Sequence, residues 1–282
     1  MPLVSIQESL IRAQAEGWGI PLFDVFEFHS IAGTIRALEE KRAPGIVALP
    51  SRWVEGPYAA VHAATVRMLA EAASVPISLM LDHGRDLEAC IRALALGFTD
   101  VMYDGSSLPV EENIANTKLV VRAARAVGVP VEAEVGHVGM GSDYDSVDAA
   151  RASFTDPATA ERFIEETGVD YLAVAIGSAH GVYKGEPQLD LDLLADIRKR
   201  VDIPLVMHGG TGLSEKQFRD AIATGIVKVN IGTDLMLTAG SRMGEVAKSA
   251  KPSYFGYTSA ISKAYQERCA YYVDVFGASG KA

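Results

Sequence analysis

The sequence contains little cysteine, an excess of acidic over basic residues and no long hydrophobic run. The two cysteines among 282 residues, Cys90 and Cys269, belong to no Cys-x-x-Cys pattern. We therefore expect reduced thiols in a reducing compartment rather than a disulfide framework. Lysine and arginine total 26 against 36 acidic residues, and the formal net charge of −10 argues against nucleic acid or an anionic membrane as a partner. A small anionic substrate is still allowed, because backbone amides can bind phosphate.

No segment has the length and apolar character of a membrane span, which needs roughly 18 to 20 consecutive apolar residues. The first 17 residues place Leu3, Ile6 and Leu10 at helical spacing among charges. They lack the apolar centre of a signal peptide. We therefore expect a cytoplasmic protein with no membrane partner.

Apolar segments of strand length alternate with helical segments along the whole chain, and the last helix is expected over residues 259–276. Eight such repeats predict an α/β protein of the (β/α)8 (TIM) barrel type, and the strand count disfavours the alternative of a doubly wound open sheet. No linker divides the chain, so we expect one domain over residues 1–282 with a helical extension from about 234 to 282. The expected strands are 19–25, 44–50, 77–84, 100–105, 129–135, 170–177, 203–208 and 226–232.

Three of these strands each deliver a histidine to their carboxyl ends, and a glycine follows each histidine. A single buried histidine is more often a hydrogen-bonded core residue than a ligand, but packing does not explain three at equivalent strand ends. The carboxyl ends of barrel strands form the rim where active sites lie. Three imidazoles with an open fourth position are typical of catalytic zinc. The candidate ligands are His83, His180 and His208.

Carboxylates accompany these histidines at the strand ends. Asp82 precedes His83 on one strand, so simple alternation points the two side chains in different directions. Asp82 could therefore orient a ligand or act as an acid or base beside bound substrate. Asp104 and Glu134 end neighbouring strands, where they could form a supporting pair or an auxiliary cation position.

Two glycine-rich segments follow the last two strands, residues 208–212 and 230–234, and each carries a threonine. Loops at these places in a TIM barrel often hold a phosphate on backbone amides. Turn chemistry alone could also explain the glycines. The hydroxyls of Thr211 and Thr233 favour the phosphate interpretation. A third loop, residues 136–153, is long for a simple connection and is typical of a functional lid.

Over nearly its whole length the chain resembles the class II (metal-dependent) ketose-bisphosphate aldolases, most closely the branch that handles fructose- and tagatose-bisphosphates. The motifs that carry the resemblance are Leu81-Asp82-His83-Gly84, Asp104-Gly105-Ser106, Val131-Glu132-Ala133-Glu134, Gly177-Ser178-Ala179-His180-Gly181, His208-Gly209-Gly210-Thr211-Gly212 and Val229-Asn230-Ile231-Gly232-Thr233-Asp234.

The resemblance implies that the three histidines hold Zn²⁺, or Co²⁺, Mn²⁺ or Fe²⁺ in its place. It implies that the metal stabilises an enediolate of dihydroxyacetone phosphate and that Asp82 shuttles the proton on the aldehyde-derived oxygen. Asp104 and Glu134 match positions around an alternative metal site. A monovalent cation, Na⁺ or K⁺, is implied beside the phosphate, and the family suggests a homodimer or homotetramer. The expected substrate and phosphate contacts are Asp24, Ser51, Gly181, Lys184, Gly209, Gly210, Thr211, Asn230, Gly232 and Thr233. Lys184 fits a solvated loop equally well.

The chain also departs from the family pattern. The family carries Asn where Asp24 stands, and its mobile loop carries a glutamate that removes the carbon-bound proton. Here that loop has no glutamate, so Asp143 or Asp145 is the candidate base. We therefore expect an aldolase that reversibly cleaves a phosphorylated ketose, or a related keto-sugar, other than fructose 1,6-bisphosphate to dihydroxyacetone phosphate or a close analogue plus an aldehyde. An isomerase or epimerase with the same enediolate chemistry, and a non-catalytic phosphosugar-binding protein, are the alternatives.

Overall fold

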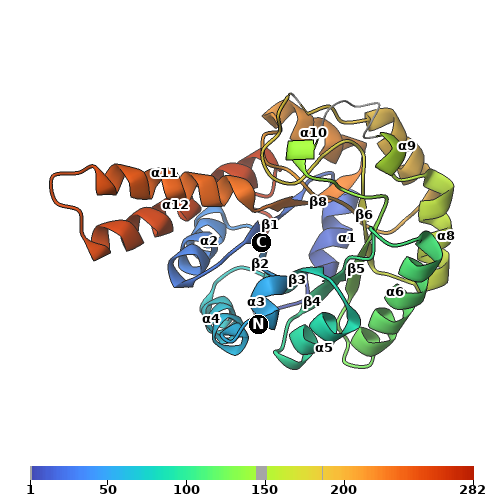
Figure 1. The fold of residues 1–282 in the computed structure, drawn as a ribbon, viewed down its shortest axis with the longest axis horizontal. Helices are drawn as coiled ribbons and strands as arrows, with labels where there is room; N and C mark the ends of the chain where they lie inside the picture. The colour runs from blue at the N-terminus through green and yellow to red at the C-terminus, as the bar shows by residue number, and fades with distance from the viewer. Residues whose placement is uncertain (1, 144–150, 186) are drawn as a thin grey trace.

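Eight parallel strands close into a barrel in chain order in the computed structural model, which describes residues 2–143, 151–185 and 187–282. Pairing of the first strand with the last, with Ile20 opposite Lys228, closes the cylinder. The (β/α)8 prediction is thus confirmed (Figure 1). The strands are β1 (Ile20–Asp24), β2 (Gly45–Pro50), β3 (Ile77–Gly84), β4 (Asp100–Tyr103), β5 (Val131–Val135), β6 (Tyr171–Val174), β7 (Leu205–Met207) and β8 (Ile226–Ile231).

Helices surround the barrel, and none of those in the described residues is both long and apolar enough to cross a membrane. The helices are α1 (Gln7–Glu16), α2 (Phe28–Lys41), α3 (Ser51–Glu55), α4 (Ala59–Ala72), α5 (Leu87–Ala95), α6 (Val110–Arg125), α8 (Pro157–Thr167), α9 (Leu191–Arg200), α10 (Glu215–Thr224), α11 (Thr233–Ala247) and α12 (Tyr254–Val275), with short 3₁₀ turns at η1 (Gly141–Asp143) and η2 (Arg151–Ser153).

The elements differ from the sequence prediction at several places, among them β6, which ends at Val174 rather than at residue 177. The fifth strand starts at Val131 rather than at residue 129, because Pro130 has no N–H to give to a neighbouring strand. Helix α12 starts at Tyr254, five residues before its expected start, where Ser253 accepts a hydrogen bond from the Gly256 amide and caps it. The single-turn helix α3 was not predicted, since five residues are too few to show a helical period.

The N-terminal segment closes the end of the barrel at which the strands begin. Asp100, fully buried at the start of β4, accepts hydrogen bonds from Ser78 Oγ (2.6 Å), Tyr171 OH (2.8 Å), Ser5 Oγ (3.1 Å) and the Ile6 amide. These donors satisfy a carboxylate that would otherwise be costly to bury. The opposite end, formed by the strand carboxyl ends, therefore remains for a site.

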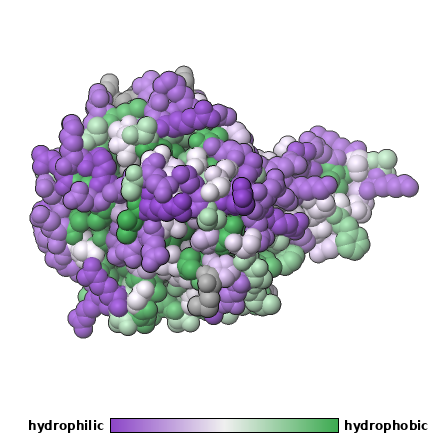
Figure 2. Space-filling view, turned by 180° about the vertical axis from the view of Figure 1, so that it is seen from behind, coloured by the Kyte–Doolittle hydropathy of each residue, from purple (hydrophilic) through white to green (hydrophobic). Residues whose placement is uncertain are grey.

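Helices α11 and α12 form a hairpin that projects beyond the barrel (Figure 1), and hydrophobic and hydrophilic residues lie side by side on it (Figure 2). The base of α12 packs on α2, where Gly33 allows close approach: a Cβ there would overlap the Ser262 carbonyl. Arg268 pairs with Asp234 across the hairpin. Near the tip, two adjacent aromatic residues are largely exposed, Tyr254 (73%) and Phe255 (80%).

Candidate active site

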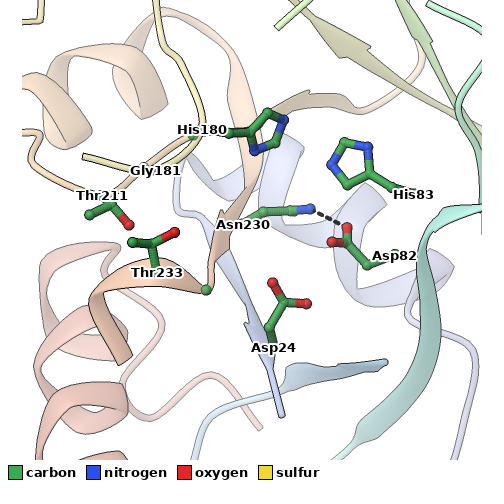
Figure 3. Close-up of a pocket in the computed structure, with 11 residues that line it drawn as sticks. Asp24, Asp82, His83, His180, Gly181, Thr211, Asn230 and Thr233 are labelled. Atoms are coloured by element: carbon green, nitrogen blue, oxygen red, sulfur yellow. Dashed lines mark hydrogen bonds between the residues drawn. The ribbon is translucent and has the colours of Figure 1, made fainter. Parts of the chain in front are cut away.

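A pocket opens at the carboxyl ends of the strands, and two chemically different groups of residues line it (Figure 3). One side carries carboxylates and imidazoles, and the other is made of glycines and threonines with no basic side chain. The lining residues are Asp24, Asp82, His83, His180, Gly181, Gly209, Gly210, Thr211, Asn230, Gly232 and Thr233.

The three candidate histidines come together as a compact cluster. One ring nitrogen from each of His83, His180 and His208 lies within 4.8 Å of the others. The rings meet edge to face, with centroids 4.6 Å apart for His83 and His208 and 4.8 Å apart for His83 and His180. Residues 83, 180 and 208 are far apart in sequence, so the fold brings the cluster together.

Hydrogen bonds to carboxylates fix which nitrogen of each ring points inward. His83 Nδ1 lies 2.8 Å from Asp104 Oδ2, and His208 Nε2 lies 2.9 Å from Glu132 Oε1. Because a carboxylate accepts, these two nitrogens carry the hydrogens. The other ring nitrogens, His83 Nε2 and His208 Nδ1, lie 3.0 Å apart, so protonated His83 donates to His208 across this gap. A divalent metal that took both nitrogens as ligands would replace that proton, and the donor set fits such a metal.

The electrostatics of the rings agree with this donor set. Burial lowers the pKa of His180 to about 3 and holds that of His208 well below its usual range, so both are neutral ligands at pH 7. Burial acts the same way on His83, but Asp82 and Asp104 outweigh it and raise the pKa of His83 to about 10. The site therefore attracts positive charge, either as a proton or as a metal ion.

A second potential metal position shares His83 with Asp104 and Glu134. Burial, followed by the charge of Asp104, raises the pKa of Glu134 to about 8. Its Oε2 atom is buried and finds no hydrogen-bond partner among the residues the structure describes. This buried carboxyl oxygen, 3.5 Å from His208 Nδ1, suits an auxiliary cation position, since a bound cation would favour its ionised form.

Asp82 and His83 both face the pocket, although simple alternation would send adjacent side chains to opposite faces (Figure 3). The expectation of different directions was wrong because β3 has an irregular register between Leu81 and Gly84. His83 takes a left-handed conformation, with φ of 51°. Such a conformation is uncommon outside glycine and asparagine and re-aims one side chain at this strand end.

Asp82 is held by a chain of buried polar groups. Its Oδ1 accepts a hydrogen bond of 2.8 Å from Asn230 Nδ2. Asn230 Oδ1 accepts one of 2.8 Å from Lys228 Nζ, which also lies 2.8 Å from Glu132 Oε2. Sequence reasoning assigned no role to Glu132 or Lys228. The signal was present: each is a charged residue in the middle of an apolar strand, where charge is rarely tolerated without a partner.

The other side of the pocket is suited to an anion. Its backbone amides belong to glycines and to the N-terminus of α11, where the N-cap residue Gly232 has no side chain and the Asp234 amide donates to Thr211 Oγ1 at 3.1 Å. Gly209 has φ of 72°, and a Cβ there would overlap the backbone of Ala179. Tyr183 OH accepts from the Ala179 amide and donates to the Gly209 carbonyl, so it ties two of the loops together.

Not every expected substrate contact lies in this pocket. Ser51 donates to Glu55 Oε1 at 2.7 Å and does not line it, and Lys184 is exposed and lies outside the lining. Asp24 does line it. Burial, then the charge of Asp82, raises the pKa of Asp24 well above its usual range. Its Oδ1 atom has no hydrogen-bond partner within the described part of the chain.

The long loop after β5 reaches the metal-ligand cluster through its backbone. The Gly141 amide donates to the His180 carbonyl at 2.7 Å, and the His180 amide donates to the Gly139 carbonyl at 2.8 Å. Asp143 follows in the 3₁₀ turn η1, two residues beyond this anchor. The other candidate base, Asp145, lies outside the described residues.

A TIM barrel with a three-histidine cluster beside an anion-binding rim defines a metal-dependent enzyme acting on a small anionic substrate. Residues 4–281 match the family described as class-II fructose-bisphosphate aldolase, and the chain belongs to that family. The prediction of a class II aldolase, a carbon–carbon lyase acting on a phosphorylated ketose, is therefore confirmed at the level of the family.

Curated relatives and solved structures agree with this placement. The fructose-bisphosphate aldolase of Staphylococcus aureus (strain Mu50 / ATCC 700699) is 36% identical, and the probable fructose-bisphosphate aldolase of Bacillus subtilis (strain 168) is 35% identical, with 100% of both chains covered in each case. The crystal structure of the YdjI aldolase from Escherichia coli K12 shares 34% identity and superposes with a TM-score of 0.90 over 99% of each chain. The fructose-bisphosphate aldolase structure from Campylobacter jejuni, at 23% identity and a TM-score of 0.84 over 99% of this chain and 97% of that chain, shows the fold alone.

Proposed function

We propose that the protein reversibly cleaves a phosphorylated ketose to dihydroxyacetone phosphate, or a close analogue, and an aldehyde. The observation that carries the proposal is the convergence in one pocket of His83 and His180, which cluster with the buried His208, together with Asp82 and the glycine- and threonine-lined anion site. Both halves are needed, because the donor offers a carbonyl to one side and a phosphate to the other. Cleavage then occurs where the two halves meet.

We propose zinc as the metal, with Co²⁺, Mn²⁺ or Fe²⁺ as substitutes, held by His83, His180 and His208. When bound, a divalent metal supplies Lewis-acid polarisation of the ketose carbonyl. Asp104 and Glu134 offer the alternative position for it. We propose that Asp82, which lines the pocket and whose Oδ1 accepts a hydrogen bond from Asn230, carries the proton of the aldehyde-derived oxygen.

For the phosphate we propose Gly181, Gly209 and Gly210 together with the α11 N-terminus, with Thr211 and Thr233 adding hydroxyl donors. A monovalent cation, Na⁺ or K⁺, would balance charge there. Asn230 and Gly232 also line the pocket, and we propose them as further substrate contacts. The proposed roles of Ser51 and Lys184 would require contacts outside this pocket.

Asp24 bears on which ketose is cleaved. The family carries Asn at this position, whereas the raised pKa of Asp24 makes it a carboxyl that can both donate to and accept from a substrate hydroxyl. We therefore propose a substrate other than fructose 1,6-bisphosphate. Asp143 or Asp145 in the loop after β5 would remove the carbon-bound proton.

We further propose a cytoplasmic homodimer or homotetramer, in which residues 1–282 act as one domain and the α11–α12 hairpin contacts the partner subunit. The exposed aromatic pair at the tip of the hairpin supports an interface there.

The proposal is tested by proton exchange of dihydroxyacetone phosphate in deuterated water, followed by NMR with and without a chelator. Chelator-sensitive exchange is the expected result, and it requires the metal, the donor and a working base together. An aldehyde screen then identifies the second product. Exchange without any cleaved aldehyde would instead favour an isomerase or epimerase. No exchange in protein with metal bound would contradict the dihydroxyacetone phosphate donor or show that the base is missing.

A further inference from the structure

The interior of the barrel contains a charged pair that the proposed chemistry does not use. Lys228 on β8 is 0% exposed, and its Nζ lies 2.8 Å and 3.1 Å from the two oxygens of Glu132 on β5. Glu132 is also fully buried. A buried ion pair is costly to maintain unless further hydrogen bonds compensate both groups. Both Lys228 and Glu132 are therefore expected to make further hydrogen bonds.

Each group of the pair also contacts a different residue of the candidate active site. Lys228 Nζ also donates to Asn230 Oδ1 at 2.8 Å, and Glu132 Oε1 also lies 2.9 Å from His208 Nε2. Lys228 and Asn230 are two residues apart on β8, so both side chains point into the barrel. The pair thus contacts one residue that binds Asp82 and one proposed metal ligand.

Donor and acceptor rules make both contacts directional. An ammonium group only donates, so the Asn230 atom facing Lys228 must be its oxygen, and its NH2 group must face Asp82. A carboxylate only accepts, so the nitrogen of His208 facing Glu132 must carry a hydrogen, and the other ring nitrogen is left with its lone pair. One ion pair therefore fixes an amide orientation and an imidazole tautomer together.

We propose that Glu132 and Lys228 are positioning residues of this enzyme: Glu132 sets the His208 tautomer that leaves Nδ1 free for the metal, and Lys228 sets the Asn230 orientation that presents a donor to Asp82. Neither residue lines the pocket, so both act through the side chains they hold. The inference rests on the proposed metal site, but zinc binding can be measured without any substrate.

The test compares zinc affinity in the Glu132→Gln variant with that of the wild-type protein, by competition with a chromophoric chelator. A glutamine has one acceptor atom, and the Lys228 ammonium takes it. The NH2 group then faces His208 and requires the other tautomer. We expect zinc affinity to fall about 10- to 100-fold, the usual effect of losing a group that orients a ligand, and the visible spectrum of the Co²⁺-loaded protein to change.

Lys228→Met separates the two roles. It leaves the contact between Glu132 and His208 but frees the Asn230 amide to rotate. We expect zinc affinity not to weaken, while kcat for cleavage by the zinc-saturated variant falls with little change in KM. An equal loss of zinc affinity in both variants would contradict this division of roles.

Tyr171→Phe is the matched control, because it removes a buried hydrogen bond to Asp100 at the far end of the same barrel. A purely structural role for Glu132 would make Glu132→Gln resemble this control, with a lower Tm, unchanged zinc affinity and an unchanged Co²⁺ spectrum. That result would overturn the proposal. If a single variant does not fold because it buries an unpaired charge, the double variant E132M/K228M removes both charges and leaves no acceptor for His208 Nε2–H, so its zinc affinity decides the question by the same criterion. Absence of any aldolase turnover would instead count against the proposed function.

Discussion

At the scale of single residues, Asp82 has the contacts of a group that moves a proton while held in place. Asn230 binds one of its oxygens, and the side chain is nearly fully buried. The Asp82→Asn variant keeps the side-chain volume and can still accept the hydrogen bond from Asn230, but its amide cannot carry the proton. We expect cleavage to fall about 10²- to 10⁴-fold, while zinc affinity stays at the wild-type value. Steady-state cleavage assays and chelator competition check this. Full activity in the variant would exclude the role.

A second residue, Asp100 at the other end of the barrel, is expected to make the folding stability depend on pH. Burial outweighs the hydrogen bonds from Ser78 and Tyr171 and raises the pKa of Asp100 to about 6, from 3.8 for the free side chain. The folded protein thus binds this proton more tightly than the unfolded chain. Its contribution to stability is fully present below about pH 4 and is lost as the pH rises through about 6, a change of about 2–3 kcal/mol.

Urea unfolding of wild type and Asp100→Asn across pH 4 to 7 checks this, because asparagine does not titrate. We expect the stability of the wild type relative to the variant to decrease up to about pH 6 and then to remain constant. A relative stability that increases over this interval would show that the hydrogen bonds to Asp100 prevail over its burial.

At the scale of elements, the strands and their carboxyl ends could be predicted because the signals are local. Apolar runs bounded by glycine or proline mark each strand, and His83 and His208 stand at or next to such ends, whereas His180 lies in the loop beyond Val174, where β6 ends. The irregular register that turns both Asp82 and His83 inward could not be predicted, because it depends on how β3 pairs with β4. The contact between Glu132 and Lys228 depends on residues 96 positions apart that meet across the barrel.

The loop after β7 contains Gly209, and substitution of this residue tests the proposed phosphate site. In Gly209→Ala, the new methyl group would overlap the Ala179 backbone, and φ of 72° is strained for alanine. We expect weaker binding of dihydroxyacetone phosphate together with a lower Tm, measured by calorimetry and thermal unfolding. Gly244→Ala in α11 is the control: nothing lies within 4 Å of the new methyl group, and we expect about 0.5–1 kcal/mol of added stability with unchanged binding. Wild-type binding in Gly209→Ala would show that the phosphate lies elsewhere.

At the scale of the whole molecule, the α11–α12 hairpin is the part whose surface suits a partner subunit. Tyr254 and Phe255 lie together on it, 73% and 80% exposed, and burying a large apolar side chain contributes about 1.5–3 kcal/mol. An intramolecular role does not account for two such side chains in solvent at the far end of a projecting element. We expect the wild-type protein to be a dimer or tetramer, and the double variant Tyr254→Ser/Phe255→Ser to dissociate at a protein concentration at least tenfold higher than the wild type does.

Light scattering across a dilution series measures this, and Lys251→Ala, an exposed change on the same connection between α11 and α12, is the control. Because both aromatic residues lie far from the barrel core, the double variant should keep the wild-type zinc affinity. A wild-type protein that is monomeric at every concentration, or a double variant with the wild-type mass, would exclude this surface as the interface. Retained mass with a lower Tm would instead mean that the aromatic pair stabilises the hairpin itself.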